Sequence, residues 1–295
     1  MRLTATALAV ICSALAAQYD PFAEARQAEV NGARLAYVER GIGGTPVILV
    51  HGSGADLRTW GYQLQHFGQT RRTIAYSRRF HHPNAPPAAG DVYAAGPQSD
   101  DLATFVESVA SGRADIVASS YGAVIALMAA RDHPGRVRRL VLVEPVAFSM
   151  LAPGSPEATA SDRLDVARRQ LLEGEREPAM RTFLSVLIGP GAFDLMPEST
   201  RAMLRDNLPE LTAEARAPMV TTSPRYTCQD VARVTAPTLL IDGGASAPFL
   251  RAMTRAVGAC LPHVDMRTIP GASHAVHAQQ VQAFNQIAQE FLDRP

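Results

Sequence analysis

A serine stands where an apolar, strand-like run gives way to a helix-like run. Residues 116–127 read IVASSYGAVIAL, with Ser120 two positions after Ala118 and two positions before Gly122. A turn that lifts a serine clear of a sheet brings these flanking positions close together, so both must be small. A serine presented in this way is typical of a nucleophile that attacks a carbonyl carbon. The segment therefore predicts a serine hydrolase.

A serine hydroxyl is a weak nucleophile and needs a base to take its proton. His274 stands in a glycine- and serine-rich loop, PGASH, between the last expected strand and the final expected helix. That loop emerges at the same edge of the sheet as Ser120, so we expect His274 to be the base. His277 is the alternative, although it lies closer to the start of the helix.

The tetrahedral intermediate of acyl transfer carries an oxyanion, which two backbone N–H groups commonly bind. Tyr121 is the first residue of the expected helix after Ser120, where the helix dipole also favours negative charge. The second donor is expected from the segment HGSGADLRTW at 51–60, in which Ser53 stands between two glycines. The alternative for that segment is an ordinary glycine-rich turn.

Strand-like and helix-like segments, which must position these residues, alternate along most of the chain. A β-hairpin is expected around Asn31 and Gly32, and helical periodicity recurs over 97–111, 121–133 and about 278–292. Such alternation predicts a mostly parallel sheet with helices on both faces. The expected strands are 46–50, 73–76, 114–118, 137–143, 238–241 and about 263–269.

The segment from about 149 to 227 differs from the rest, with more charge, many prolines, helical periodicity and no good strand. Because it interrupts the alternation, it is expected to be a helical lid inserted into a sheet domain that spans 28–295. A lid there lies over the carboxyl ends of the strands, where parallel sheets bind ligands. Some of its apolar residues are expected to line a pocket, among Met150, Leu151, Phe183, Leu184, Leu187, Phe193 and Met196.

Taken together, five segments resemble the α/β-hydrolase fold family over about 29–292. The resemblance implies the α/β class and the α/β-hydrolase fold, a mostly parallel central sheet flanked by helices with an inserted helical lid. It also implies hydrolysis of esters or lactones, and less often of amides, C–C bonds, epoxides or haloalkanes. The last two reactions use an aspartate nucleophile in this family, so Ser120 argues against both. The segments are HGSG at 51–54, SSYGA at 119–123, HPGRVRRLVLVEP at 133–145, PTLLIDGG at 237–244 and PGASH at 270–274.

The carboxylate that orients the histidine departs from the family's usual pattern. Most members place an aspartate a few residues past the strand 238–241, but Ser246 stands about there. A serine cannot hold a negative charge against an imidazolium, so another carboxylate is needed. Glu144 is the expected acid, because some members take their acid from the end of the strand after the nucleophile helix.

A charged residue directly after the mostly apolar run 137–143 is also unusual for a structural position. The alternatives to Glu144 are Asp242 and no acid at all. A purely structural interpretation pairs Glu144 with Arg138 or Arg139.

A second polar cluster, SRRFHHPN at 77–84, follows an expected strand and should border the pocket. In a functional interpretation, Arg78 or Arg79 binds an anionic group of the substrate, or His81 and His82 bind a metal. Adjacent histidines give poor chelating geometry, and no Asp, Glu or Cys stands beside them. The structural interpretation is a loop pinned by arginine hydrogen bonds.

Composition is that of an ordinary globular protein. The 295 residues include 47% hydrophobic and 19% charged residues, and the formal net charge is zero. This balance gives no global attraction to nucleic acid or to an anionic membrane. We expect a small-molecule substrate, no nucleic-acid partner, no cofactor and no metal; the oligomeric state stays open.

The N-terminus reads MRLTATALAVICSALAAQ, an arginine followed by an apolar stretch and a small-x-small site. This pattern predicts a secretory signal peptide over 1–17 and a secreted or periplasmic protein, the alternative being cytoplasmic. No other segment is long enough to cross a membrane. Cys228 and Cys260 would remain after cleavage, either bonded to each other or as two free thiols.

The residues together predict a hydrolase of small to medium, partly hydrophobic carboxylic esters or lactones that acts through an acyl-enzyme. Ser120 is the expected nucleophile, His274 the base and Glu144 the acid, with the N–H groups of Ser53 and Tyr121 binding the oxyanion. The alternatives are a different reaction on the same residues, such as C–C bond hydrolysis or an aminopeptidase, and a non-catalytic ligand-binding protein of the same fold.

Overall fold

The computed structural model describes residues 21–218, 222 and 225–295. The expected signal peptide at 1–17 lies outside these residues. Within the described part of the chain, no helix is long and apolar enough to span a membrane.

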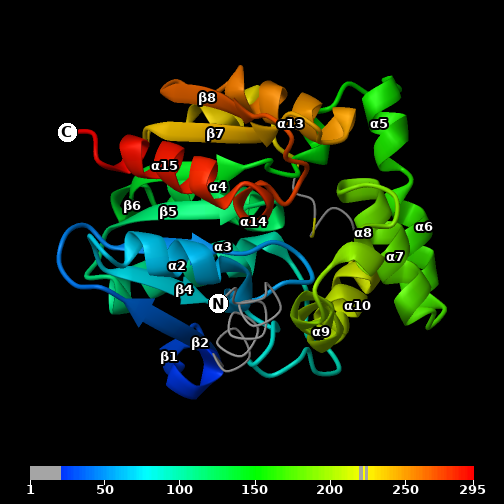
Figure 1. Ribbon diagram of the computed structural model, residues 1–295, viewed down its shortest axis with the longest axis horizontal. Coiled ribbons are helices and arrows are strands. Elements are labelled where there is room, and N and C mark those ends of the chain that lie inside the picture. Colours follow the sequence, from blue (N-terminus) through cyan, green and yellow to red (C-terminus); the bar gives the residue numbers. More distant parts are fainter. Residues whose placement is uncertain (1–20, 219–221, 223–224) are drawn as a thin grey trace, which may run out of the picture.

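Eight strands form one sheet in the order β1-β2-β4-β3-β5-β6-β7-β8 (Figure 1). β2 pairs with β1 and β4 in antiparallel fashion, and all other pairs are parallel. The sequence-based strands are confirmed to within two residues at each end, and so is the expected mostly parallel sheet. The strands are β1 (Arg26–Val30), β2 (Ala33–Arg40), β3 (Val47–Val50), β4 (Thr73–Tyr76), β5 (Ala114–Ser119), β6 (Val137–Val143), β7 (Thr238–Gly243) and β8 (Val264–Ile269).

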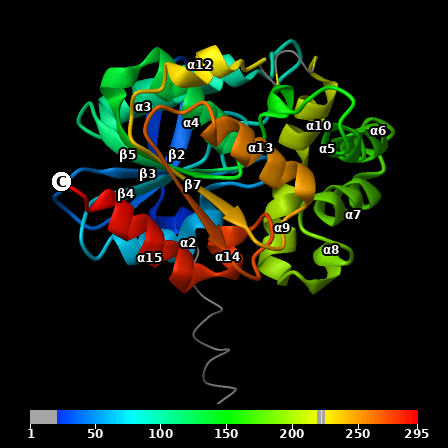
Figure 2. The same cartoon turned by 90° about the horizontal axis from the view of Figure 1, so that it is seen from above.

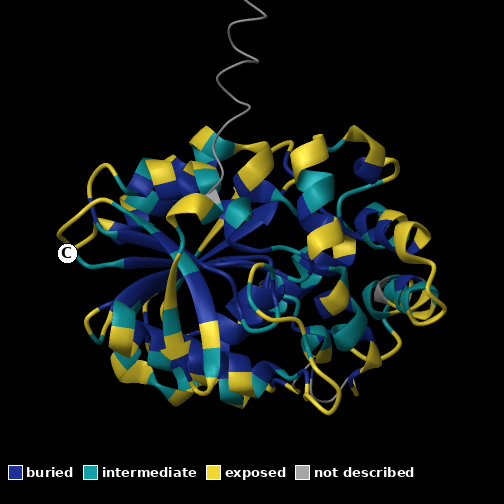
Figure 3. Cartoon of the chain, turned by 90° about the horizontal axis from the view of Figure 1, so that it is seen from below, coloured by how far each residue is buried: buried dark blue, intermediate teal, exposed yellow. Residues whose placement is uncertain are grey.

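Helices cover both faces of the sheet (Figure 2), which is why the central strands are mostly apolar and β3 is apolar throughout. Every residue of β3, β4, β5 and β7 is buried, and Figure 3 shows these strands as the buried centre of the molecule. One face carries α3 (Ala95–Val109), α4 (Tyr121–Asp132), α12 (Cys228–Ala232) and α13 (Pro248–Gly258); the other carries α2 (Gly61–Phe67), α14 (Val276–Gln279) and α15 (Val281–Leu292).

Side chains of one strand alternate between the two cores, as the period of a β-strand requires. In β3, Ile48 and Val50 join the core under α3 and α4, whereas Val47 and Leu49 join the core under α2 and α15. Burying each of these side chains contributes roughly 1.5–3 kcal/mol. The strand is thereby fixed in register, and with it the loop that follows.

A helical insertion, defined here as residues 148–217, lies between β6 and β7 (Figure 1, right). Its described residues form helices and no strand. Part of it has a small core of its own, in which Leu184 and Phe193 pack with Met180 and Leu204. The elements are η4 (Phe148–Met150), α5 (Pro156–Ser161), α6 (Leu164–Leu172), α7 (Arg176–Leu187), α8 (Ala192–Leu195), α9 (Glu198–Asp206) and α10 (Leu208–Arg216); short 3-10 turns elsewhere are η1 (Pro21–Glu24), η2 (Leu57–Trp60) and η3 (Pro134–Arg136).

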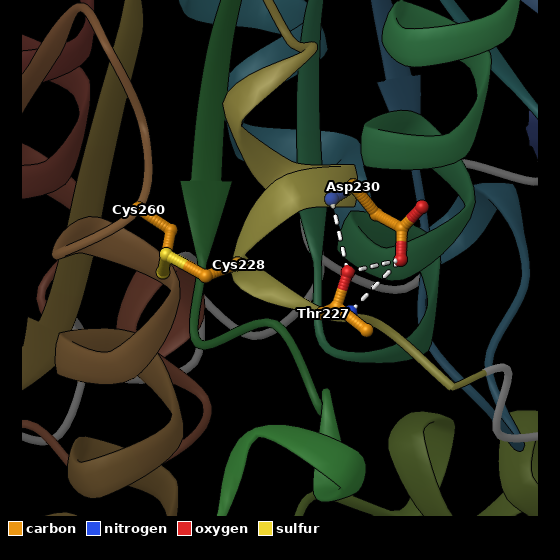
Figure 4. Close-up of a disulfide and its surroundings, with 4 residues drawn as sticks. All are labelled: Thr227, Cys228, Asp230 and Cys260. Carbon is orange, nitrogen blue, oxygen red and sulfur yellow. Dashed lines mark hydrogen bonds between the residues drawn. A yellow bond between two sulfur atoms is a disulfide. The ribbon is translucent and has the colours of Figure 1, made fainter.

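A disulfide joins Cys228, at the start of α12, to Cys260, two residues beyond α13 (Figure 4). The sequence left this pairing open. Thr227 caps α12 beside the disulfide: its Oγ1 accepts the Asp230 N–H at 3.2 Å, and its own N–H donates to the Asp230 carboxylate at 2.9 Å. The disulfide therefore fixes the point where the chain returns from the insertion to the sheet.

Reducing this disulfide is expected to lower the stability of the protein. The bond closes a loop with a sequence separation of 32 residues, and a loop of that size corresponds to a loss of about 4 kcal/mol through the greater entropy of the unfolded chain. Urea unfolding with and without reductant measures the loss. The double variant Cys228→Ser/Cys260→Ser should have the same urea midpoint as the reduced wild type, and reductant should not change that midpoint. Equal midpoints for oxidised and reduced wild type would contradict the expectation.

Candidate active site

Ser120 occupies a strained turn between β5 and α4. Its φ of 54° and ψ of −124° lie in a region that non-glycine residues rarely adopt. The turn is held by the Ser120 N–H, which donates to the carbonyl of Val143 at 2.8 Å. A Cβ at Gly122 would lie 2.3 Å from the carbonyl oxygen of His51. Gly122 is thus required by the close approach of the end of β3.

His274 lies on the loop between β8 and α14, within reach of the Ser120 hydroxyl. Its Nε2 is 3.0 Å from Ser120 Oγ, and its Nδ1 is 2.6 Å from Glu144 Oε2. Both ring nitrogens of His274 are therefore within hydrogen-bond distance of a partner. This arrangement allows Nδ1–H to donate to the carboxylate while Nε2 accepts the serine proton.

Glu144 directly follows β6 and has the left-handed φ of 42°. Its side chain is fully buried, and its Oε1 accepts the N–H of Gly243 at 2.9 Å. Burial alone would raise the pKa of this carboxyl, but the hydrogen bonds from His274 and Gly243 and the charge of His274 outweigh it and lower the pKa. Glu144 is thus held as a carboxylate against the imidazole.

The alternative acid and base have other partners. Asp242 forms an ion pair with Arg251, whose Nε lies 3.1 Å from Asp242 Oδ2. The ring of His277 packs 4.3 Å from that of Trp60, and its Nε2 lies 3.3 Å from Thr59 Oγ1. Burial and the nearby charge of His274 lower the pKa of His277 to about 3. Neither residue contacts the Ser120 hydroxyl.

The ion pair considered for Glu144 is not formed. Arg138 instead donates to Asp115, with Nε 2.7 Å from Oδ1. Arg139 donates to the carbonyl of Pro295 at 2.7 Å. Both arginines lie near the opposite end of β6 from Glu144, so the carboxylate is left to the histidine.

The two expected oxyanion donors flank Ser120. Neither the Ser53 nor the Tyr121 N–H has a hydrogen-bond acceptor among the described residues, although the neighbouring N–H of Gly54 donates to Glu210 Oε2 at 3.1 Å. A Cβ at residue 52 would lie 2.9 Å from the Ser120 Cβ, so the glycine there lets the loop approach. The site can bind an oxyanion with two unused N–H groups, one at a helix N-terminus.

Arg78 supports the loop that follows β3 and carries Ser53, which is called the oxyanion loop below. The guanidinium is almost fully buried; Nε donates to the carbonyl of His51 at 2.9 Å and Nη2 to the carbonyl of Gly52 at 3.0 Å. It also donates to Gln98 and lies 5.2 Å from the centre of the Tyr121 ring. Because all these contacts are inside the protein, Arg78 positions the loop and does not face the substrate.

The rest of the 77–84 segment agrees with the structural interpretation, a loop pinned by arginine hydrogen bonds. Arg79 donates to Asp101 with Nε 2.7 Å from Oδ2. His81 is fully buried, with Nδ1 2.8 Å from the Arg79 carbonyl and Nε2 3.0 Å from Arg78. Burial and the charge of Arg78 lower the pKa of His81 well below its usual value. The ring nitrogens of His81 are therefore already used within the protein.

A cavity of about 720 Å³ opens over Ser120 between the sheet and the helical insertion. Ser53 and Tyr121 also line it. Of the apolar residues expected to line a pocket, Leu151, Phe183 and Leu187 do so; Met150, Leu184, Phe193 and Met196 instead pack in apolar clusters.

Two glutamates of α10 at the wall of this cavity were not singled out from the sequence. Glu210 is fully buried, and Glu214, one turn later, lines the cavity. The only signal in LPELTAEAR was the i, i+4 spacing of the two carboxyls, which is more often a solvated helix face. Their burial depends on how α10 docks against the loop after β3.

Comparison with known proteins places this geometry in a family. The sequence pattern described as "Alpha/beta hydrolase family" matches residues 47–287. The chain is 31% identical over 133 residues to the dihydrolipoyllysine-residue acetyltransferase component of the acetoin cleaving system of Cupriavidus necator, a match that covers 45% of this chain and 35% of that protein. The chain thus spans about a third of the length of the first curated relatives it matches.

Solved structures share the fold over nearly the whole chain. An enol-lactonase from Burkholderia xenovorans LB400 superposes with a TM-score of 0.74 and 18% identity, covering 91% of this chain and all of that one. A thermophilic esterase from Thermogutta terrifontis superposes with a TM-score of 0.72 and 24% identity, covering 91% and 97%. With the sheet order, the serine turn and the matched residues, the chain belongs to the alpha/beta hydrolase family.

Proposed function

We propose that the protein is a serine hydrolase that cleaves a small to medium, partly hydrophobic carboxylic ester or lactone through an acyl-enzyme. The observation that carries the proposal is the continuous chain of contacts from Ser120 Oγ to His274 and on to Glu144, at 3.0 and 2.6 Å. The cavity above Ser120 supports the substrate class, because most of its lining is apolar. An esterase and a lactonase share the fold.

In the first half of the reaction, Ser120 Oγ attacks the carbonyl carbon as His274 Nε2 takes its proton. Glu144 stabilises the imidazolium that forms and keeps Nδ1 protonated. The carbonyl oxygen becomes an oxyanion, to which the N–H groups of Ser53 and Tyr121 donate. His274 then gives its proton to the leaving oxygen, the C–O bond breaks, and the acyl group remains on Ser120.

In the second half, water takes the place of the leaving group. His274 Nε2 accepts a proton from the water as its oxygen attacks the acyl carbon. The same N–H groups receive the second oxyanion, which collapses as the bond from the acyl carbon to Ser120 Oγ breaks; His274 Nε2 returns its proton to Oγ, and the acid is released. For a lactone, the leaving oxygen stays attached to the acyl chain, so one hydroxy acid is released.

A fluorophosphonate probe is expected to label wild-type protein on Ser120 and to abolish hydrolysis in proportion to labelling. The reason is that the probe reacts with a serine activated by a base and leaves a stable adduct. Peptide mass spectrometry locates the adduct. His274→Ala, which removes the base and keeps the serine, should label far more slowly; a protein that binds no probe under conditions that label a known serine esterase would rule the proposal out.

A further inference from the structure

We propose that Tyr121 and Glu214 form a polar subsite that binds an oxygen substituent on the acyl chain of the substrate, close to the scissile carbonyl. The inference rests on the proposed function and narrows its substrate class to oxygen-substituted acyl esters or lactones. It predicts that a hydroxy or alkoxy acyl group is preferred over the plain acyl group of the same length.

The order of strands places this subsite on the acyl side of Ser120. Ser120 follows β5, and in the sheet β3 and β4 lie on one side of β5 while β6, β7 and β8 lie on the other. His274 follows β8 and must protonate the leaving oxygen, so the leaving group lies on that side. The acyl chain then extends toward the loops after β3 and β4. Glu214 lies there, because its carboxyl interacts with Ser53 and Arg78.

Tyr121 brings an unused hydroxyl to this side of the cavity. The residue is only 3% exposed and lines the cavity, yet its hydroxyl has no hydrogen-bond partner among the described residues. The ring is fixed, since it stacks 6.2 Å from Tyr93 and 5.2 Å from the Arg78 guanidinium. A buried hydroxyl left without a partner costs about 1–3 kcal/mol. A ligand oxygen that hydrogen-bonds to it removes this cost.

Glu214 supplies the second half of the subsite. It lines the same cavity, and its Oε2 is buried without a hydrogen-bond partner in the described part of the chain. Burial raises the pKa of the Tyr121 phenol, so its hydroxyl keeps its proton. The two groups thus line one cavity, and each retains hydrogen-bonding capacity for an atom of the substrate.

The donors around the two carboxyls decide which of them holds a proton. Glu210 accepts the Gly54 N–H and the Tyr93 hydroxyl. Glu214 has fewer donors. Two carboxylates this close cannot both be charged, so the proton resides mainly on Glu214.

The charged and titratable groups that act on Glu214 or feel its charge are Glu210, Arg78, Tyr93 and Tyr121. Burial raises its pKa first, Glu210 raises it further, and Ser53 and the charge of Arg78 lower it in part; the pKa settles at about 8. Tyr93 and Tyr121 face it as neutral phenols, both with raised pKa values because of burial. At neutral pH, Glu214 is therefore mostly a neutral acid that donates a hydrogen bond.

This chemistry selects oxygen atoms over carbon. A neutral carboxylic acid and a phenol can each donate to a hydroxyl, ether or ketone oxygen, and each can accept from a hydroxyl. A plain alkyl chain leaves both groups unpaired, and a site built to bind a polar group rejects an analogue that lacks it. The apolar lining beyond, which includes Leu211 and Met180, accommodates the rest of the chain.

Three ethyl esters test the subsite in pairwise competition: butanoate, 3-hydroxybutanoate and 3-methoxybutanoate. Competition yields the ratio of kcat/KM values directly. Because the same catalytic residues act on all three esters, the pH dependence of catalysis cancels from this ratio. Wild type is expected to prefer each oxygen-substituted ester over butanoate about tenfold or more at pH 7, as the gain of one to two hydrogen bonds predicts. Chromatography of the released acids measures the ratios.

Three variants localise the preference. Tyr121→Phe removes the hydroxyl and keeps the ring and the backbone N–H, and Glu214→Leu removes the carboxyl. In each variant, the kcat/KM values of the two oxygen-substituted esters should come to within about threefold of the value for butanoate. Asp165→Asn is the matched control, because this exposed carboxylate of α6 lies at the outer part of the same cavity. Its ratios should equal those of wild type.

The pH arm separates a binding role from a structural one. As the pH rises from 7 to 9.5, Glu214 loses its proton and can no longer donate. The methoxy ester, which only accepts, should then lose its preference, whereas the hydroxy ester, which can donate to the carboxylate, should keep most of it. Glu214→Gln cannot titrate, so its ratios should not change with pH.

The outcomes distinguish the inference from the proposed function. Turnover of the esters with no preference for oxygen, or a preference that survives both Tyr121→Phe and Glu214→Leu, overturns the subsite and leaves the serine hydrolase intact. Failure to hydrolyse any of the three esters counts against the proposed function and overturns the subsite with it.

Discussion

Replacing Ser120 with alanine is expected to lower kcat for ester hydrolysis by about 10⁵-fold, as loss of the nucleophile does in serine hydrolases. The oxyanion N–H groups and the cavity remain, so a small residual rate above the uncatalysed reaction should persist. The effect is measured from initial rates at saturating substrate, with enough enzyme to detect the residual activity.

Ser119→Ala is the matched control for this change. Ser119 is the last residue of β5, and removing its hydroxyl leaves the contact between Ser120 and His274 in place. Its rate should stay within about tenfold of wild type. If Ser120→Ala keeps more than a hundredth of the activity while Ser119→Ala does not, the nucleophile has been misassigned.

Glu144→Gln is expected to lower kcat by about 10⁴-fold with little change in fold. Glutamine has the size of glutamate, but its amide group can donate to Nδ1 and stabilise the imidazole tautomer that has its proton on Nε2. That tautomer cannot accept the Ser120 proton. The loss of negative charge also leaves the imidazolium without a counter-ion, so both effects act in the same direction.

Asp242→Asn provides the comparison. Asp242 pairs with Arg251, not with His274, so its kcat should remain within about tenfold of wild type. Thermal unfolding of both variants checks that neither has lost its fold. A large decrease of kcat in Asp242→Asn, together with a near-normal kcat in Glu144→Gln, would show that Asp242 is the acid.

The sheet could be predicted from the sequence because its strands are short apolar runs that end at recognisable turns. The run 46–50 is an example: helices on both faces force every position of β3 to be apolar. The amphipathic helices α2 and α13 were not anticipated. They are only 7 and 11 residues long, so each offers few turns over which a helical period can be counted.

The positions of Ser120, His274 and Glu144 could be predicted because each follows a strand at the same edge of the sheet. Glu144 in particular is a charged residue directly after a buried strand. A charged side chain at such a position conflicts with burial, and conflicts of this kind are expected at functional sites. The structural interpretation of 77–84 anticipated arginine hydrogen bonds such as those of Arg78, but the roles of Glu210 and Glu214 could not be anticipated. Their burial arises from contacts between elements that are distant in the sequence, such as the 156 positions between Gly54 and Glu210.

The contact between α10 and the loop after β3 has a consequence for how such a protein can change over time. Glu210 accepts the Gly54 N–H, one residue from the Ser53 amide proposed to bind the oxyanion. The helical insertion is therefore not an interchangeable module placed over a finished catalytic apparatus. A chimera that exchanges residues 148–217 for those of a relative inherits a new pocket and also removes a support of the oxyanion loop, so substrate range and catalytic competence evolve together.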